Sequence, residues 1–344
     1  MQSLKRIRVV QIGVAHDHAA ATFETMCRMN DLFDVVGYAV PEGDDETRAS
    51  KPAYSGSKRL TVDEVLSDPT LEAVVIETSE QALTRTALLC ADRGLHIHMD
   101  KPGGLSLSDF ETLANTVKER GDVFHMGYMY RYNPAIQDLL KMVRRGDFGE
   151  ILSVEAQMNC WHKPEKRSWL GQFPGGMTFF LGCHLVDLIL QIQGMPQELI
   201  PMNVSSGLCQ NHAIDTGFVL FRYPHSYSFL RTIATEVGGC PRRQLVVTGT
   251  EGTVELKPLE YNRGIVDERY LYTDMTLTTD KSWHCTSFHR TYGPYGRYDA
   301  MMRDFAEIIR GKAENRYTPE YELTLFRTLL KCCKGTDEKL SEQL

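Results

Sequence analysis

The sequence lacks any long hydrophobic run. None of its stretches approaches the roughly 18 uncharged apolar residues that a membrane helix needs. The first apolar run, within residues 7–12, follows basic residues as in a signal peptide, but it is short, has no A-x-A-like cleavage site and leads into Gly13. We therefore predict that this run is a buried strand and that the protein is cytoplasmic.

The chain also has no excess of positive charge. Its 38 Lys and Arg residues against 45 Asp and Glu residues give a net charge of -7, and no long basic run is present. This balance argues against a nucleic-acid partner. The nine cysteines are odd in number and show no C-x-x-C spacing, so we expect reduced, structural cysteines.

The length of 344 residues predicts two domains. In about the first 125 residues, short apolar runs alternate with segments of helical periodicity. This alternation is typical of βαβ units and predicts a parallel sheet. The expected strands are 8–12, 34–40, 73–76, 96–99 and 123–127, and the expected helices are 19–29, 61–66, 81–93 and 107–120.

The pattern changes beyond about Pro134. Consecutive extended segments without intervening helices predict an antiparallel sheet, hence an α+β second domain. We divide the chain into domains 1–128 and 129–344, with the C-terminal helix packing back on the body. The expected elements are helices over 135–145, after Gly182 and over 298–334, and extended segments over 151–158, 202–208, 216–223, 227–235, 244–248 and 253–257.

The first predicted strand runs into a degenerate dinucleotide-binding loop. A dinucleotide fold has G-x-G-x-x-G here, for the turn, for close approach to pyrophosphate and for helix packing. Gly13 matches, Ala15 is a small substitute, and His18 takes the third place. The helix that follows would present its N-terminus to the pyrophosphate. The residues assigned to the cofactor in this region are Gly13, Ala15, His16, Asp17, His18 and Thr78.

His16 and His18 flank Asp17, so a metal site is one interpretation of the loop. Three side chains within three loop residues rarely converge on one ion, and the sequence assigns no further ligand. The interpretation we favour is a capped helix start, in which Asp17 accepts helix N–H groups and the imidazoles lie near phosphate. We therefore predict no metal.

The acid that reads the ribose is expected at the end of the second strand. Val40 holds the strict position, and Glu42 follows two residues later. Binding of a ribose diol by Glu42 would favour NAD, whereas Asp44 and Asp45 make a solvated acidic loop an equally good interpretation. No Arg or Lys precedes Arg48 in this loop, which disfavours a 2′-phosphate site.

Two segments carry candidate catalytic residues. Lys101 lies in a Met-Asp-Lys-Pro turn at the end of a predicted parallel strand, where such sheets bind ligands. Its ammonium is suited to donate to a sugar hydroxyl or to act as acid or base, and the competing interpretation is an exposed turn lysine. His184 follows Gly175-Gly176, where glycines would bring backbone close to a ligand; it is either a proton relay or a core histidine, with Asp187 three residues later.

Taken together, these segments resemble the glucose–fructose oxidoreductase/inositol dehydrogenase/rhizopine catabolism (Gfo/Idh/MocA) family, nearly end to end. Asp100-Lys101-Pro102 is similar to the family's Glu-Lys-Pro. The other matching segments are residues 125–134, 146–151, Trp169 before the paired glycines, Gly182-x-His184-x-x-Asp187 and the turn 249–253.

The resemblance implies a Rossmann domain followed by a domain whose large open sheet often mediates homodimers or homotetramers. It implies hydride transfer between NAD or NADP and a secondary carbinol carbon of a sugar, cyclitol or glycoside. Lys101 and His184 correspond to the family's catalytic residues, with Lys101 and Pro102 also beside the cofactor. The residues expected to border the substrate are Tyr130, Arg131, Trp169, Phe180 and Asp187.

The chain departs from the family at Phe180, where an Asp is usual four residues before the histidine. Three explanations stay open: a dehydrogenase with an apolar substrate moiety against Phe180, an NAD-retaining enzyme that cleaves glycosides through a transient keto-sugar, and a non-catalytic binding or regulatory homologue. At this stage we expect Phe180→Asp to change substrate preference more than stability.

Overall fold

The computed structural model describes residues 5–209, 211–264 and 270–334, which form two compact units. The first unit comprises the residues up to Met129 together with Tyr298–Phe326, and the second comprises Tyr130–Arg297 and the residues from Arg327 on. The sequence-based division after residue 128 left the whole C-terminal tail in the second domain, whereas the structure groups Tyr298–Phe326 with the first unit.

The first unit contains a six-stranded sheet in the order β3-β2-β1-β4-β5-β6, and all its strand pairs are parallel. The predicted parallel sheet is thus confirmed. Its central strands are buried on both faces, since Ala73–Ile76 are entirely inaccessible, as expected for strands covered by crossover helices. The strands are β1 Ile7–Ile12, β2 Phe33–Ala39, β3 Arg59–Leu60, β4 Ala73–Ile76, β5 His96–Met99 and β6 Phe124–Met126.

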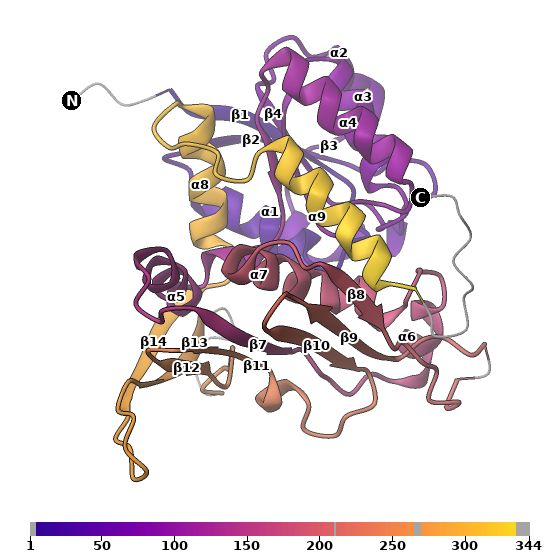
Figure 1. Cartoon of the computed structure of the whole chain (residues 1–344). Helices are drawn as coiled ribbons and strands as arrows, with labels where there is room; N and C mark the ends of the chain where they lie inside the picture. The colour runs from indigo at the N-terminus through magenta and orange to yellow at the C-terminus, as the bar shows by residue number, and fades with distance from the viewer. Residues whose placement is uncertain (1–4, 210, 265–269, 335–344) are drawn as a thin grey trace. The chain divides into compact units, whose positions relative to one another are not determined.

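Local sequence signals delimit the helices of this unit. For α4, the Ser106 side chain accepts a hydrogen bond from the backbone of Asp109, and Gly121 ends the helix in the left-handed conformation. Near the chain end, α8 lies beside α1 (Figure 1). The Arg28 side chain donates to Asp299 at 2.8 Å. The helices are α1 Ala19–Arg28, α2 Val62–Ser67, α3 Leu83–Asp92, α4 Leu107–Arg120 and α8 Asp299–Ile309, and α9 Pro319–Cys332 contains the division between the units.

The second unit is built on an eight-stranded sheet in the order β14-β13-β12-β11-β7-β10-β9-β8. Only the β7–β10 pair is parallel, so the predicted, mainly antiparallel sheet is confirmed. Buried residues alternate along β9 and β10, and the helices α5 and α7 lie against the sheet (Figure 1). The strands are β7 Ile151–Gln157, β8 Glu198–Pro201, β9 Thr216–Arg222, β10 Tyr227–Ile233, β11 Gln244–Gly249, β12 Thr253–Leu256, β13 Tyr270–Thr278 and β14 Phe288–Gly296.

Several elements of this half of the chain differ from the prediction. The segment 202–208, predicted to be extended, contains only bridge residues, at Asn203 and Val204, and the strand lies earlier at β8. Two strands, β13 and β14, were not predicted. The predicted helical tail is two helices, α8 and α9. The helices that begin in the second unit are α5 Pro134–Arg145, α6 Pro164–Leu170 and α7 Cys183–Gln193.

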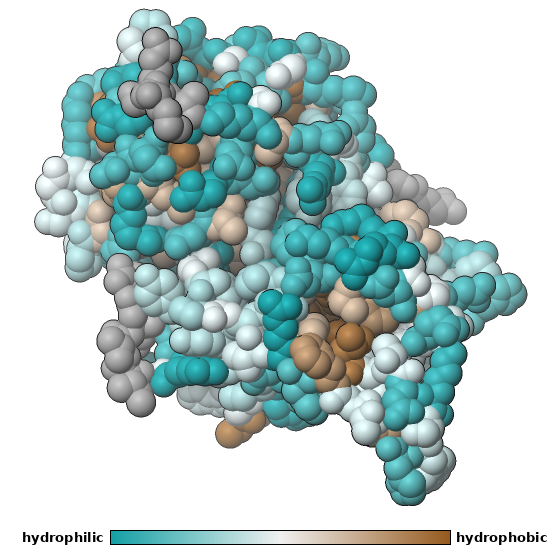
Figure 2. Space-filling view, turned by 90° about the vertical axis from the view of Figure 1, so that its left-hand side faces the viewer, coloured by the Kyte–Doolittle hydropathy of each residue, from teal (hydrophilic) through white to brown (hydrophobic). Residues whose placement is uncertain are grey.

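No helix among the described residues is long and apolar enough to cross a bilayer. On the face shown in Figure 2, hydrophilic residues cover most of the surface, and hydrophobic residues gather in one patch.

The nine cysteines are all free, and three of them, Cys27, Cys240 and Cys285, are exposed.

Candidate functional site

The carboxyl end of the parallel sheet carries the first group of candidate residues. Gly13 follows β1 at φ +97°, and a Cβ there would lie 2.3 Å from the Thr78 backbone nitrogen. Only glycine therefore allows this close approach to the end of β4. Thr78, which the sequence analysis assigns to the cofactor, is buried there beside the loop.

The backbone of the loop after Gly13 already binds a carboxylate. Asp44 Oδ2 accepts hydrogen bonds from the N–H of Val14 at 2.8 Å and of Ala15 at 3.3 Å, and Asp44 Oδ1 accepts from Ser79 at 3.1 Å. Burial raises the pKa of Asp44, and these hydrogen bonds oppose that shift. Glu42, the predicted ribose acid, is exposed, whereas the Asp44 side chain contacts the loop directly.

The two histidines of the loop converge on Asp100, which follows β5. Asp100 Oδ2 lies 3.1 Å from His16 Nδ1 and 2.8 Å from His18 Nδ1. His16 and Asp100 are buried, and the His18 side chain is 14% exposed. The predicted capped start of α1 is not observed. The N-cap residue is His18, and its side chain makes no cap hydrogen bond. Asp17, the predicted cap, accepts a hydrogen bond from Arg48.

The pKa values of the two buried acids in this group, Asp100 and Glu77, shift in opposite directions. Burial alone would raise its pKa, but the charges and hydrogen bonds of His16 and His18 hold the pKa of Asp100 well below its usual range. Glu77, which follows β4 and is fully buried, has its pKa raised well above the ordinary value by burial and then by the Asp100 charge. Burial also lowers the pKa of His18, against the attraction of Asp100.

Lys101 follows Asp100 and is 1% exposed, so it is not the exposed turn lysine that local sequence left open. Its backbone N–H donates to Asp100 Oδ1 at 2.6 Å, and its carbonyl oxygen lies 3.2 Å from His16 Nε2. Pro102 is buried beside it, and its carbonyl lies 3.5 Å from the Tyr128 hydroxyl. The turn is therefore tied to the loop after β1 and to the strand β5.

In the second unit, a π-helical turn, Thr178–Gly182, leads into α7 and His184. Such turns are frequent at functional sites. His184 is 2% exposed, and its ring packs edge-on against Tyr130, with centroids 5.0 Å apart. The Tyr130 hydroxyl also donates to Glu260 at 2.6 Å, which holds the Tyr130 ring beside His184.

Arg131 and Asp187 were both predicted to border the substrate, and the structure joins them to each other. Arg131 Nε and NH2 donate to the two carboxylate oxygens of Asp187 at 2.9 Å, and both side chains are almost fully buried. Gln191 also donates to Asp187. This bidentate pair holds the segment Met129–Tyr132 against α7.

Phe180 and Trp169 belong to one apolar cluster. Their rings meet edge-on at 5.2 Å, and Phe180 is 6% exposed. The ammonium of Lys166 lies 3.5 Å from the Trp169 ring centroid and 4.6 Å from that of Phe180. The other members of the cluster are Cys160, Leu170, Met177, Leu181 and Ala234.

The paired glycines before this turn do not hold space open for a ligand. A Cβ on Gly175 would lie 2.6 Å from Cys333, and one on Gly176 would lie 2.0 Å from the Ile214 carbonyl oxygen. Their conformations, φ +62° and +46°, also favour glycine. They therefore serve close packing of the chain against itself.

Sequence reasoning missed a polar group in the same unit. Asn159, just past β7, is fully buried, and neither atom of its side-chain amide has a hydrogen-bond partner in the described part of the chain. Arg243 donates to the Asn159 carbonyl and to Glu260, which also pairs with Arg297. The position of Asn159 at a strand end was the available signal.

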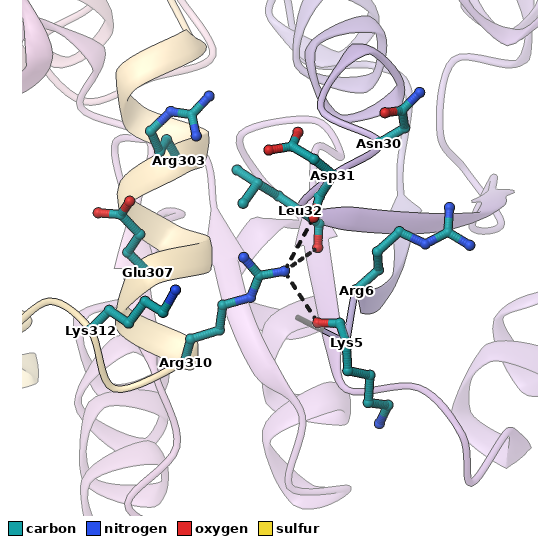
Figure 3. A pocket seen from close by; sticks show the side chains of 9 residues that line it. All are labelled: Lys5, Arg6, Asn30, Asp31, Leu32, Arg303, Glu307, Arg310 and Lys312. Carbon is teal, nitrogen blue, oxygen red and sulfur yellow. Dashed lines mark hydrogen bonds between the residues drawn. The ribbon is translucent and has the colours of Figure 1, made fainter. Parts of the chain in front are cut away.

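A pocket of about 850 Å³ lies at the opposite, amino-terminal edge of the first unit's sheet (Figure 3). The Arg310 guanidinium donates there to the backbone carbonyls of Lys5 and Leu32, at the starts of β1 and β2. Ligands in parallel sheets bind at the carboxyl ends, so this pocket is not where the cofactor is expected.

Family models match both halves of the chain. Residues 7–128 match the model described as "Oxidoreductase family, NAD-binding Rossmann fold", and residues 136–255 match "GFO/IDH/MocA C-terminal domain". The chain belongs to the GFO/IDH/MocA family. The predicted family and the predicted fold, a Rossmann domain followed by a domain with a mainly antiparallel sheet, are thus confirmed.

The relatives within the GFO/IDH/MocA family are distant. The chain is 22% identical over 293 residues to scyllo-inositol 2-dehydrogenase (NADP(+)) of Bacillus subtilis (strain 168), covering 81% of this chain and 80% of the relative. It is 24% identical over 206 residues to 2,7-anhydro-N-acetylneuraminate hydratase of Escherichia coli (strain K12), covering 57% and 54%. The chain thus spans about half the length of several curated relatives that it matches.

Solved structures of the same fold cover nearly the whole chain. The aldose-aldose oxidoreductase from Caulobacter crescentus superposes with a TM-score of 0.77 at 15% identity, over 96% of this chain and 98% of that one. At this identity the likeness shows the fold. The family to which the chain belongs is thus an oxidoreductase family with an NAD-binding Rossmann fold.

Proposed function

We propose that this protein transfers hydride between a nicotinamide dinucleotide and a secondary hydroxyl carbon of a sugar, cyclitol or glycoside. The observation that carries the proposal is Lys101, buried at the carboxyl end of β5 in a chain of the GFO/IDH/MocA family. A buried ammonium at this edge is suited to exchange a proton with a substrate hydroxyl. The cofactor supplies the hydride chemistry when bound.

The loop after β1 fits a dinucleotide. Gly13 allows close packing of the turn, and the N–H groups of Val14 and Ala15 converge on an anionic carboxylate, which is the chemistry that phosphate or a ribose-binding acid would use. We propose that Asp44 reads the ribose diol and that NAD is preferred, since the carboxylate would repel a 2′-phosphate.

The proposed proton transfer rests on two residues, each described within its own unit. In the first unit, Lys101 exchanges the hydroxyl proton. In the second unit, the family resemblance assigns His184, beside Tyr130, the role of a proton relay. Asn159 is suited to bind a substrate hydroxyl, because its buried amide offers both a donor and an acceptor. Arg131 and Asp187 are positioning residues, since their charges neutralise each other.

The test is a panel of sugars, cyclitols and aryl glycosides, assayed with NAD+ and with NADP+ by the absorbance of the reduced nicotinamide. We expect turnover with at least one polyol and a higher kcat/KM with NAD+. Failure to bind either dinucleotide, measured by fluorescence titration, would overturn the enzyme proposal and favour the non-catalytic homologue.

A second candidate is an NAD-retaining enzyme that cleaves or hydrates a glycoside-like substrate through a transient keto-sugar. It is favoured by the similarity to the hydratase of Escherichia coli and by Phe180 in place of the usual acid. A stoichiometric nicotinamide that survives dialysis, together with product formation without net NADH release, would support this candidate over the dehydrogenase.

We further propose that the protein is a homodimer or homotetramer, as the sequence resemblance implied. Light scattering coupled to size exclusion measures this directly. A mass of 39.1 kDa in solution, that of one chain, would contradict it.

A further inference from the structure

Four side chains from three strand ends converge inside the first unit. His16 and His18 follow β1, Glu77 follows β4, and Asp100 follows β5. Nitrogen or oxygen atoms of His16, His18 and Asp100 all lie within 4.8 Å of one another, and Glu77 Oε2 lies 3.6 Å from His16 Nδ1. Asp100 and Glu77 come from neighbouring strands, because β4 pairs with β5.

His16 Nδ1 lies at the centre of this cluster. It is 3.1 Å from Asp100 Oδ2 and 3.6 Å from Glu77 Oε2, and the His18 backbone N–H donates to it at 3.3 Å. His16 Nε2 lies 3.2 Å from the Lys101 carbonyl oxygen, which only accepts, so Nε2 carries a hydrogen. In the neutral ring, the Nδ1 lone pair therefore lies beside two carboxylates, and a cation bound there would attract all three groups.

Glu77 gives an independent indication of a ligand. Its side chain is fully buried, and neither carboxylate oxygen has a hydrogen-bond partner among the described residues. Buried carboxylates are ordinarily paired, hydrogen-bonded or bound to a metal. The Glu77 carboxylate is turned toward His16, so its unsatisfied oxygen points into the same cluster.

We propose that His16, His18, Asp100 and Glu77 bind a divalent first-row transition metal ion. Two imidazole nitrogens and two carboxylate oxygens are donors that Zn²⁺, Co²⁺ or Mn²⁺ accept. Tetrahedral ligand atoms at about 2.0–2.2 Å from an ion stand roughly 3.3–3.6 Å apart. Asp100 Oδ2 lies 3.1 Å from His16 Nδ1 and 2.8 Å from His18 Nδ1, and Glu77 Oε2 lies 3.6 Å from His16 Nδ1, so these contacts are near the spacing of ligand atoms around one ion.

The site has the character of a structural metal centre. Four protein ligands would fill a tetrahedral ion, and the Lys101 carbonyl would orient the His16 ring from outside, as outer partners of metal-binding histidines do. The ion would tie the ends of β1, β4 and β5 together. This inference goes beyond the proposed redox function and does not depend on it.

The test uses the full-length protein after treatment with a chelator. We expect Co²⁺ to bind at one equivalent with the visible absorption of a tetrahedral ion, and Zn²⁺ to displace it. Saturating Zn²⁺ should raise the thermal midpoint by about 5 °C. Absence of saturable Co²⁺ binding, or an unchanged thermal midpoint with Zn²⁺, would show that hydrogen bonds hold the four side chains together without a metal ion. Either result would overturn the proposal.

Variants locate the bound ion. Loss of a residue that only hydrogen-bonds to a metal ligand weakens metal binding by roughly 10- to 100-fold. His18→Asn and Asp100→Asn each remove a ligand, so each should weaken Zn²⁺ binding by more than that. Asp17→Asn is the matched control, since Asp17 lies between the two histidines but contacts Arg48, and it should keep the wild-type affinity for Zn²⁺. His18 is partly exposed, so its variant is informative even where Asp100→Asn does not fold. Wild-type Zn²⁺ affinity in His18→Asn would place the ion elsewhere.

Discussion

Asp44 and Val14 are joined by a hydrogen bond in which the carboxylate accepts from the backbone N–H at 2.8 Å. A second bond, from Ala15, reaches the same oxygen. Asp44, two residues beyond the predicted Glu42, therefore contacts the glycine turn after β1 directly, and we propose it as the acid that serves the dinucleotide.

Asp44→Asn should weaken NAD+ binding by about 10- to 100-fold, because hydrogen bonds to a charged group contribute about 1.5–3 kcal/mol. The ratio of NADP+ to NAD+ affinity should rise, since the repulsion of a 2′-phosphate is removed. Fluorescence titration with both dinucleotides measures this. Glu42→Gln is the matched comparison. A loss of affinity in Glu42→Gln but not in Asp44→Asn would restore Glu42 as the ribose acid.

Lys101→Ala should reduce kcat by about 10²- to 10⁴-fold, the usual contribution of a positioned acid or base. The loss should appear without unfolding, as far-UV circular dichroism and the thermal midpoint would report. Lys118, an exposed lysine of the same unit that pairs with Glu320, provides the control variant Lys118→Ala. Turnover at the wild-type rate in Lys101→Ala would exclude Lys101 from the reaction.

Much of the fold was predictable because the spacing of apolar residues along the chain reflects which side chains are buried. The observed bounds of β4, β5 and α4 match the predicted residues. The continuous apolar run of β4 and the Ser106 cap of α4 mark two of these elements locally. The strand β14 was not predicted because most of its residues are exposed, and its sequence therefore carries no apolar alternation.

The candidate site was less predictable because its contacts join residues distant in sequence. His16 and His18 could be located in a loop, but Asp100 comes from the end of β5, more than 80 residues later. Only the strand order brings these ends together. The pairing of Arg131 with Asp187 likewise depends on how α7 packs, which no local pattern records.

Arg131→Met should lower the free energy of unfolding by about 3–5 kcal/mol, because it leaves the Asp187 carboxylate buried without its partner. Urea denaturation measures this change. In the double variant Arg131→Met/Asp187→Leu both charges are absent, and we expect much of the lost stability to return. Equal stability of the single and double variants would mean that the ion pair is not the source of the effect.

Phe180→Asp is now expected to affect stability strongly, which revises the expectation from the sequence. The new carboxylate would lie in an apolar cluster beside Trp169 and Leu170, so a loss of about 3 kcal/mol or more is expected. Phe180→Leu, which stays apolar, should cost less. Thermal unfolding of both variants separates the effect of the buried charge from the effect of losing the aromatic ring. A fully stable Phe180→Asp protein with a new substrate profile would show that Phe180 borders the substrate.

A buried pair of histidines gives the first unit a dependence of stability on pH. The Nδ1 atoms of His98 and His125 lie 2.7 Å apart, so one ring donates to the other. Burial, and then the charge of His125, lowers the pKa of His98 to about 3. In the unfolded chain the pKa is about 6.5. Protonation of the unfolded state therefore removes stability as the pH falls from 6.5 toward 3.

We expect this histidine to contribute a loss of about 1.4 kcal/mol of unfolding free energy for each pH unit below 6.5. His98→Gln cannot take up the proton and should lose stability less steeply between pH 6.5 and 4.5. His225→Gln, at an exposed histidine, should retain the wild-type slope. Urea denaturation at a series of pH values compares the three proteins. Parallel curves for wild type and His98→Gln would show that His98 does not carry the dependence.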